Sequence, residues 1–120
     1  MKAQEVYDKA CTYLLSMKER SMGHAEGHEI CMYRGSGGNK CVVGYFIPDE
    51  KYSKEMEGRN VCCEPVERAL GELSVYNDLL SDLQSIHDNI LNWDSDGFIA
   101  CQSLLDLGRR KGLEPFCKGK

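Results

Sequence analysis

The sequence has no long hydrophobic run. No apolar stretch in its 120 residues approaches the ~20 residues that a helix needs to cross a bilayer. The first residues, Met1 to Glu5, carry charges where a signal peptide needs an apolar segment. We therefore expect a cytoplasmic protein that makes no contact with a membrane.

The chain also lacks an excess of basic residues. It has 15 Lys and Arg against 19 Asp and Glu, a net charge of −4. Non-specific binding to a phosphate backbone needs a basic surface, so direct binding to nucleic acid is not expected. Internal repeats and low-complexity tracts are missing too. The length and the 42% hydrophobic content fit one globular domain, 1–120, with a flexible tail at 114–120.

A β-hairpin is predicted in the first half of the chain. Ile30–Arg34 alternates in polarity, and Cys41–Ile47 is rich in β-branched and aromatic residues, as strands are. The Gly-rich stretch 35–39 between them favours a tight reversal. Pro48 has no N–H and is expected to end the second strand.

Helices are predicted on both sides of this hairpin. Ala3–Arg20 carries apolar residues at helical spacing, and residues 21–28 are expected to form a loop. Three more helices are expected after the hairpin. The first runs from Glu64 to about residue 73, the second is capped by Asn77 or Asp78 with a stripe of Leu79, Leu83, Ile86 and Ile90, and the third runs from a Ser95 cap to Gly108.

These elements predict an α+β fold. A β-hairpin or small antiparallel sheet would pack against an N-terminal helix and about three C-terminal helices.

A dense motif overlaps the predicted hairpin. Residues 33–58 read YRG-x-x-G-x-KCxVGxxIPDExYxxEMEG, where x is any residue. This motif resembles a signature of small, uncharacterised proteins of bacteriophages and prophages. The resemblance covers the first half of the chain and implies a phage-like origin, hence the cytoplasm of an infected host cell. It implies no particular chemistry.

Acidic residues are concentrated in the second half of the chain. Between Glu64 and Phe98, eight acidic residues face the single base Arg68, a local charge of −7. Such a surface favours association with a basic protein surface, and Trp is enriched among interface hot spots. The leading hypothesis is therefore a phage accessory protein, with an anti-defence or other host-directed role, that binds and modulates a host or defence protein. The predicted contact residues are Asp78, Asp82, Asp88, Trp93 and Asp94.

The Gly-rich turn offers an alternative. Backbone N–H groups near Gly37 and Gly38, with Arg34 and Lys40 beside them, can hold an anion. The sequence is not a Walker A motif, because no Gly-Lys-Ser/Thr follows. The corresponding function would be a nucleotide-like small-molecule binder or a small enzyme built around the hairpin.

Seven cysteines suggest a second alternative. In a reducing cytosol, free thiols or a metal site are favoured over disulfides. His24, His28, Cys31 and Cys41 have ligand types and a spacing that zinc accepts, although the chain has no CxxC pair. A zinc-stabilised interaction module is thus possible, with Cys31 and Cys41 facing each other across the hairpin; otherwise no cofactor is expected.

A cysteine nucleophile is the last possibility considered. Cys41, His87 and Asp88 have the residue types of a thiolate, a base and an orienting acid. Cys41, however, stands among apolar residues, and His87 lies at the edge of an apolar helix stripe. Both positions favour packing over chemistry, so no catalytic residue is assigned and an enzyme is not the expectation.

Overall fold

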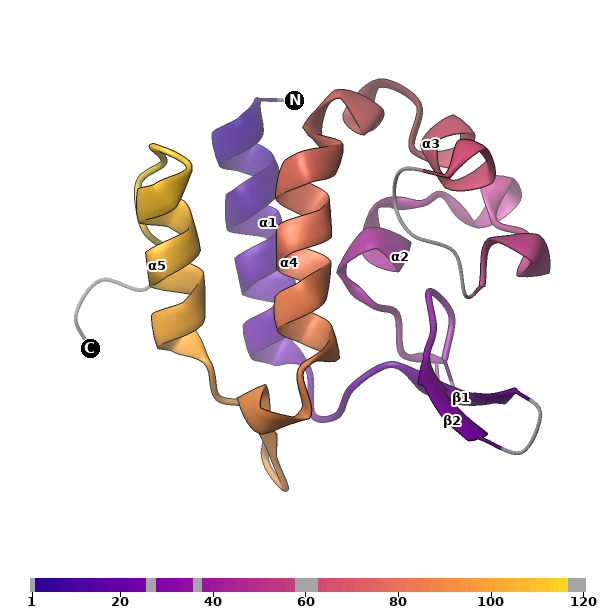
Figure 1. Cartoon of the computed structure of the whole chain (residues 1–120), viewed down its shortest axis with the longest axis horizontal. Coiled ribbons are helices and arrows are strands. Elements are labelled where there is room, and N and C mark those ends of the chain that lie inside the picture. The colour runs from indigo at the N-terminus through magenta and orange to yellow at the C-terminus, as the bar shows by residue number, and fades with distance from the viewer. Residues whose placement is uncertain (1, 26–27, 36–37, 58–62, 117–120) are drawn as a thin grey trace.

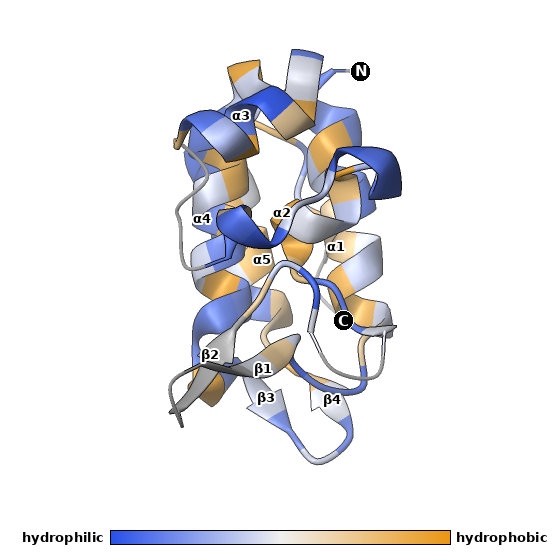
Figure 2. Ribbon diagram, turned by 90° about the vertical axis from the view of Figure 1, so that its right-hand side faces the viewer, coloured by the Kyte–Doolittle hydropathy of each residue, from blue (hydrophilic) through white to orange (hydrophobic). Residues whose placement is uncertain are grey.

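Three helices of the chain lie side by side in one half of the molecule (Figure 1). The computed structural model describes residues 2–25, 28–35, 38–57 and 63–116, and for 24, 25 and 28–31 it describes the backbone. The three helices are α1 (Ala3–Ser16), α4 (Asn77–Asp88) and α5 (Cys101–Arg110). Hydrophobic and hydrophilic residues alternate along the helices (Figure 2), as amphipathic helices require.

Shorter elements fill the other half and one end of the molecule (Figure 1). Two antiparallel ladders are present among the described residues, one of β1 with β2 and one of β3 with β4. The predicted α+β class is confirmed. The bounds are β1 Met22–Ala25, β2 His28–Cys31, α2 Val42–Phe46, η2 Asp49–Lys51, η3 Lys54–Met56, α3 Glu64–Leu70, η4 Gly71–Tyr76, η5 Ile90–Asn92, β3 Trp93–Asp94 and β4 Gly97–Phe98, where η marks a 3-10 helix.

The core lies between the three long helices and α2. Leu14 of α1, Leu83 of α4 and Leu104 of α5 have no exposed surface. The Tyr7 hydroxyl of α1 donates to the carbonyl oxygen of Leu104 at 2.6 Å, so a polar group inside the core is satisfied. The predicted N-terminal helix is confirmed, although it ends at Ser16 rather than Arg20.

The predicted hairpin is wrong in its second strand. Residues 42–46 form α2, whose N-cap Cys41 accepts the Gly44 backbone N–H on its Sγ at 3.3 Å. A Cβ at Gly44 would lie 2.1 Å from the Tyr33 carbonyl oxygen, so this helix approaches the preceding segment at glycine. Of the predicted ladder, a single bridge between Arg34 and Lys40 remains.

The actual hairpin lies earlier in the chain than predicted: β1 falls in the segment 21–28 that was predicted as a loop, and β2 overlaps the start of the predicted first strand, Ile30–Arg34. β1 pairs with β2, with Met22 opposite Cys31 and Ala25 opposite His28. The predicted pairing of Cys31 with Cys41 is therefore wrong. The apolar run after Cys41 is buried by tertiary packing, and burial overrides the strand preference of its β-branched residues.

The predicted start of the α4 helix also needs correction. Asn77 is the first residue of α4 and makes no cap; its Nδ2 donates to Glu67 Oε2 at 2.9 Å. At the other end, Ile90 lies outside the helix and is 65% exposed. His87, which the sequence placed at the edge of this stripe, is buried in α4.

The last helix begins later than predicted. Ser95 lies in the turn between β3 and β4, not at a cap, and α5 begins at Cys101. Gly108 is inside α5, where a Cβ would lie 2.6 Å from the Tyr7 hydroxyl oxygen. Gly112, with a φ of 71°, follows the end of the helix, as a C-terminal glycine does.

Residues 114–116 of the predicted tail lie against α1. Glu114 N–H donates to Gln4 Oε1 at 2.9 Å, and Phe116 N–H donates to the Tyr7 hydroxyl oxygen at 3.1 Å. Residues 117–120 lie outside the described part. In that described part, every helix falls short of the length and hydropathy that crossing a membrane would take.

Candidate functional site

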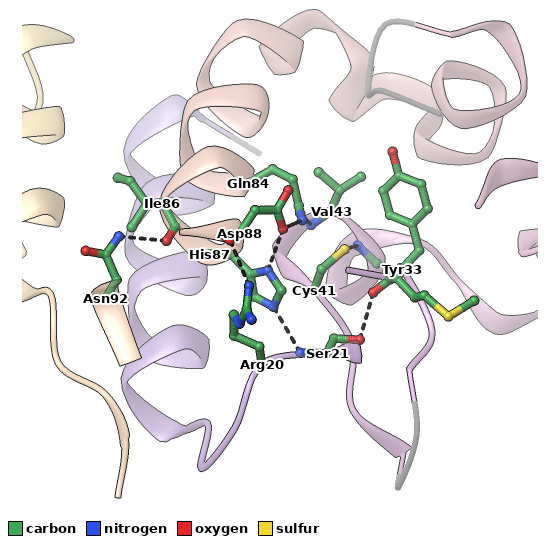
Figure 3. Close-up of polar contacts among 12 residues, drawn as sticks. Arg20, Ser21, Tyr33, Cys41, Val43, Gln84, Ile86, His87, Asp88 and Asn92 are labelled. Atoms are coloured by element: carbon green, nitrogen blue, oxygen red, sulfur yellow. Dashed lines mark hydrogen bonds and ion pairs between the residues drawn. The ribbon is translucent and has the colours of Figure 1, made fainter. Parts of the chain in front are cut away.

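A buried histidine links α4 to the segment that follows α1. His87 has no exposed surface, and its Nε2 accepts the Ser21 backbone N–H at 3.2 Å. Its Nδ1 lies 2.8 Å from Asp88 Oδ1 (Figure 3). Because Nε2 is an acceptor, the hydrogen-bond network assigns the ring proton to Nδ1, facing the carboxylate.

The neighbours of this histidine complete a structural network (Figure 3). Gln84 donates from Nε2 to Asp88 Oδ1 at 2.8 Å and accepts the Val43 N–H at 3.2 Å. The Ser21 hydroxyl donates to the carbonyl oxygens of Met32 and Asn39, at 2.7 and 3.1 Å, and not to the imidazole. Ser21, His87 and Asp88 are therefore not arranged as a nucleophile, a base and an orienting acid.

The Cys41 thiol is equally unsuited to nucleophilic chemistry. Its side chain is 1% exposed, and burial raises the pKa of the thiol far above its ordinary value. The His87 Nε2, which would have to act as its base, is already occupied by Ser21 N–H. A nucleophile needs an accessible thiolate, so this residue is a core thiol.

Four cysteines have side chains in the described part of the chain, and three of them are free. Cys11, Cys41 and Cys63 are free, as expected, and burial raises the pKa of the Cys11 thiol to about 12. Cys101 is disulfide-bonded, which contradicts the expectation of reduced thiols at this position.

The predicted zinc site stays a prediction. The side chains of His24, His28 and Cys31 lie outside the described residues. In the rest of the molecule, where side chains are described, no three His, Cys, Asp or Glu residues gather as metal ligands. Cys41 uses its sulfur to accept the Gly44 N–H.

The described residues of the motif at 33–58 are joined into a cluster by internal hydrogen bonds. The Glu57 carboxylate accepts the backbone N–H of Tyr33 at 2.8 Å and that of Arg34 at 3.1 Å, and it also accepts the Tyr52 hydroxyl. Burial, then the bond to Glu57, raises the pKa of Tyr52 to about 12. These bonds thus join Tyr33 and Arg34, at the start of the motif, to Glu57 near its end.

Arg34 occupies the middle of this cluster. Its guanidinium pairs with Asp49, donates to the Ile47 carbonyl oxygen at 2.8 Å and lies 4.9 Å from the Tyr52 ring centroid. The bond to Arg34 holds the pKa of Asp49 below its usual range. Lys40 Nζ lies 3.7 Å from the same Asp49 carboxylate.

The predicted anion site therefore has both of its cations facing a carboxylate of the chain. Gly38 has a φ of 81° and open space around its Cα, while Gly37 lies outside the described residues. Anion binding at this turn stays a prediction.

A pocket of about 400 Å³ lies between η3 and α3. Its wall includes the bases Lys51 and Arg68 and the acids Glu50 and Glu55. The charges balance, and Arg68 pairs with Glu64. Nothing in this lining selects an anionic ligand such as a nucleotide.

The predicted acidic contact residues are spread along α4 and beyond it. Asp78 is exposed near the start of α4, Asp82 pairs with Lys111 Nζ at 3.0 Å, and Asp88 supports His87 from the helix end. Asp94 is exposed in β3. The predicted contact residues thus differ in their bonding: Asp82 and Asp88 are bonded within the chain, whereas Asp78 and Asp94 are exposed.

Trp93 is held rather than free. Its Nε1 donates to the His87 carbonyl oxygen at 2.8 Å, and its ring meets those of His87 and Phe98 edge to face, at 5.5 and 5.2 Å between centroids. The side chain is half-buried. Its role is to fix β3 on the end of α4.

Sequence analysis missed a group of exposed aliphatic residues at this same end. Ile90 is 65% exposed, Leu91 82% and Ile99 54%. The exposed acids Asp94 and Asp96 belong to the hairpin between them. We call these five residues the acidic–apolar end. The signal was available, because Asn89, Asn92 and Gly97 interrupt the helical pattern around the aliphatic residues.

Comparison with known proteins adds no relative: no protein-family model, curated protein or solved structure matches this chain.

Proposed function

We propose that this chain is a binding protein that engages another protein through its acidic surface, from α4 to the β3–β4 hairpin. The observation that carries the proposal is the acidic–apolar end. Large aliphatic side chains exposed together are typical of interaction sites, and carboxylates beside them favour a basic partner surface.

The groups that could perform chemistry support a binding role by their arrangement. His87 and Cys41 are buried and hydrogen-bonded within the chain. Arg34 and Lys40 face Asp49, which weakens the case for a nucleotide-like ligand at the Gly-rich turn. The exposed aliphatic and acidic side chains of the acidic–apolar end are instead typical of a protein contact.

The phage-like motif supports a host or defence protein as the partner. A phage accessory protein would modulate that partner by occupying a basic surface that the partner uses for something else. The negative band suits such a role, because charge complementarity speeds association and selects partners.

The proposal is tested with charge reversals at the exposed end. Wild-type chain, an Asp94→Lys/Asp96→Lys variant and a control variant, Glu50→Lys/Asp106→Lys, are immobilised and exposed to bacterial lysate. All four positions are exposed, and the two variants change net charge equally. We expect a partner that wild type and the control retain and the test variant loses, identified by mass spectrometry.

Two results would contradict the proposal. In one, every protein retained by wild type is also retained by the Asp94→Lys/Asp96→Lys variant. In the other, wild type retains nothing above the level of an empty support.

A further inference from the structure

The exposed aliphatic residues of the chain are not evenly spread. Seven large hydrophobic side chains are exposed in the described part of the molecule, and Ile90, Leu91 and Ile99 fall within one short segment. The Ile99 N–H donates to the Asn92 carbonyl oxygen at 2.9 Å, which brings the end of β4 beside η5. Ile90 and Leu91 of η5 and Ile99 after β4 therefore lie close together, and we call these three residues the patch.

The patch rests on a fixed support. The last turn of a helix leaves carbonyl oxygens without helical partners, and here two side chains fill that role. Asn92 Nδ2 donates to the Ile86 carbonyl oxygen at 2.8 Å, and Trp93 Nε1 donates to that of His87 at 2.8 Å. Leu91 N–H donates to Asn89 Oδ1 at 3.0 Å. A preorganised patch loses little conformational entropy when a partner binds.

Charge next to the patch favours one sign of partner. Asp94 and Asp96 are exposed in the turn, where Asp94 Oδ1 accepts the Asp96 N–H at 2.8 Å. The Asp88 side chain, 42% exposed, lies at the end of α4. Two bases are at the same end: the Lys18 backbone lies beside Gly97 of the hairpin, and Arg20 donates to the Asp88 carbonyl oxygen at 2.9 Å. The acids outnumber the bases, so a cationic segment fits.

The shape of this end limits the mode of binding. The β3–β4 hairpin projects from one end of the molecule beyond the helices (Figures 1 and 2). Each of its strands has two residues, which are already paired with one another. Such short strands offer few free backbone groups for strand addition, so a partner must bind through side chains, as the apolar face of an amphipathic helix does.

From these contacts we infer that the acidic–apolar end binds a cationic amphipathic helix of the partner protein. Apolar residues of that helix cover Leu91, Ile90 and Ile99, and its Lys or Arg residues lie against Asp94 and Asp96. The inference rests on the proposed function and adds the chemistry of the partner segment.

Binding of a helical peptide can be followed by the fluorescence of Trp93. This residue is the one tryptophan of the sequence, it is the first residue of β3, and it follows Leu91 by two positions. The probe is a synthetic peptide of Leu and Lys, about 18 residues long and so about five helical turns, with Leu at helical spacing and no tryptophan. We expect a saturable change in Trp93 fluorescence, a gain of peptide helicity in circular dichroism and weaker binding at high salt.

Matched variants locate the contact. Leu91→Ser/Ile99→Ser should raise the Kd at least about tenfold, the effect of losing one interface hot spot. Val75→Ser is the control, because Val75 is 76% exposed but lies on η4; its Kd should stay within about twofold of wild type. Asp94→Asn/Asp96→Asn should weaken binding and reduce its salt dependence.

Several outcomes would overturn the inference. They are the absence of saturable binding, equal binding of a scrambled peptide of the same composition, and equal binding of a Leu/Glu peptide. Light scattering that shows a wild-type dimer abolished by Leu91→Ser/Ile99→Ser would assign the patch to a second copy. Binding of the chain to phosphatidylcholine vesicles, lost in the same variant, would assign it to a lipid surface.

The two experiments distinguish a failure of this inference from a failure of the proposed function. If the peptide does not bind but the Asp94→Lys/Asp96→Lys variant loses a captured partner, the acidic surface binds a protein of another chemistry. If both experiments fail, the binding function itself is wrong.

Discussion

Polar side chains are bonded within the chain in the motif cluster, around Glu57 and Arg34, whereas those of the acidic–apolar end are exposed. In the cluster, Glu57 accepts the backbone N–H groups of Tyr33 and Arg34, and the Arg34 guanidinium donates to the Ile47 carbonyl oxygen, although its buried Nε has no partner. At the other end, Asp94 and Asp96 point their charge to solvent beside exposed Leu91. Dense sequence motifs are often taken as sites, yet this one holds a fold together, and the better candidate for binding lies in a stretch without a motif.

The largest effect is expected at Gly44, inside the motif. In Gly44→Ala the new methyl group would meet the Tyr33 carbonyl oxygen at 2.1 Å, and a backbone group cannot rotate away. We expect a loss of about 3 kcal/mol in the free energy of unfolding, measured by denaturant titration. Gly38→Ala is the control, since its φ of 81° is strained for alanine but nothing lies near; its cost should be about 1 kcal/mol.

The second largest loss of stability is expected for His87→Ala. It leaves the Ser21 N–H without its acceptor and opens a cavity where a fully buried ring packs against Trp93. Together these effects should cost about 3 kcal/mol. Thermal unfolding followed by near-ultraviolet circular dichroism checks this, because Trp93 reports on the same contact. An unchanged midpoint would mean that the network does not support the fold.

Glu57→Gln tests the motif cluster with a smaller change. The amide replaces an acceptor oxygen by an NH₂ group, which would face the N–H of Tyr33 or Arg34. The expected loss is about 2 kcal/mol in the free energy of unfolding. Glu50→Gln, at an exposed position of the same segment, should change stability by less than about 0.5 kcal/mol. Equal losses in both variants would contradict the role given to Glu57.

Substitutions at the acidic–apolar end should weaken binding and leave stability almost unchanged. Leu91→Ser/Ile99→Ser removes side chains that are 82% and 54% exposed, so stability should change by less than about 0.5 kcal/mol. Denaturant titration of this variant, beside its peptide affinity, separates binding from folding. A loss of several kcal/mol would show that these residues belong to the core.

The smallest effect concerns the Asp49 carboxyl. Its pKa lies below the ordinary value of 3.8 because Arg34 and Lys40 favour the charged form. A lowered pKa in the folded state stabilises the fold above the ordinary pKa, and this contribution is lost as the pH falls through the lowered value. A carboxyl titration by NMR should show the low midpoint, and Arg34→Gln should raise it toward 3.8. An unchanged midpoint in that variant would contradict the pairing.

Parts of the architecture were predictable because they depend on local pattern. The helical spacing of Val6, Tyr7, Ala10 and Leu14 predicted α1, and all four are buried. The α+β class followed from such elements without knowledge of their contacts.

The hairpin was predicted in the wrong place because it was inferred from strand propensity and not from helical spacing. Val42 and Val43 have high strand propensity, but they lie in α2 with no exposed surface. Strand propensity depends strongly on context, and here the run is a buried short helix whose Gly44 lies close to the Tyr33 backbone. Ile90 was wrongly included in the apolar stripe, since the helix ends at Asp88 and Ile90 is 65% exposed. The packing of His87 was predicted and is confirmed.

Local periodicity and composition alone decided that this chain folds into amphipathic helices with a small sheet and that its second half is strongly negative. Which polar groups are internal and which are offered to a partner depended on long-range packing. Ser21 bonds His87 across 66 positions, and Tyr33 bonds Glu57 across 24. Contacts between residues so far apart in the chain leave no periodic trace in it, because each depends on where the other elements come to rest.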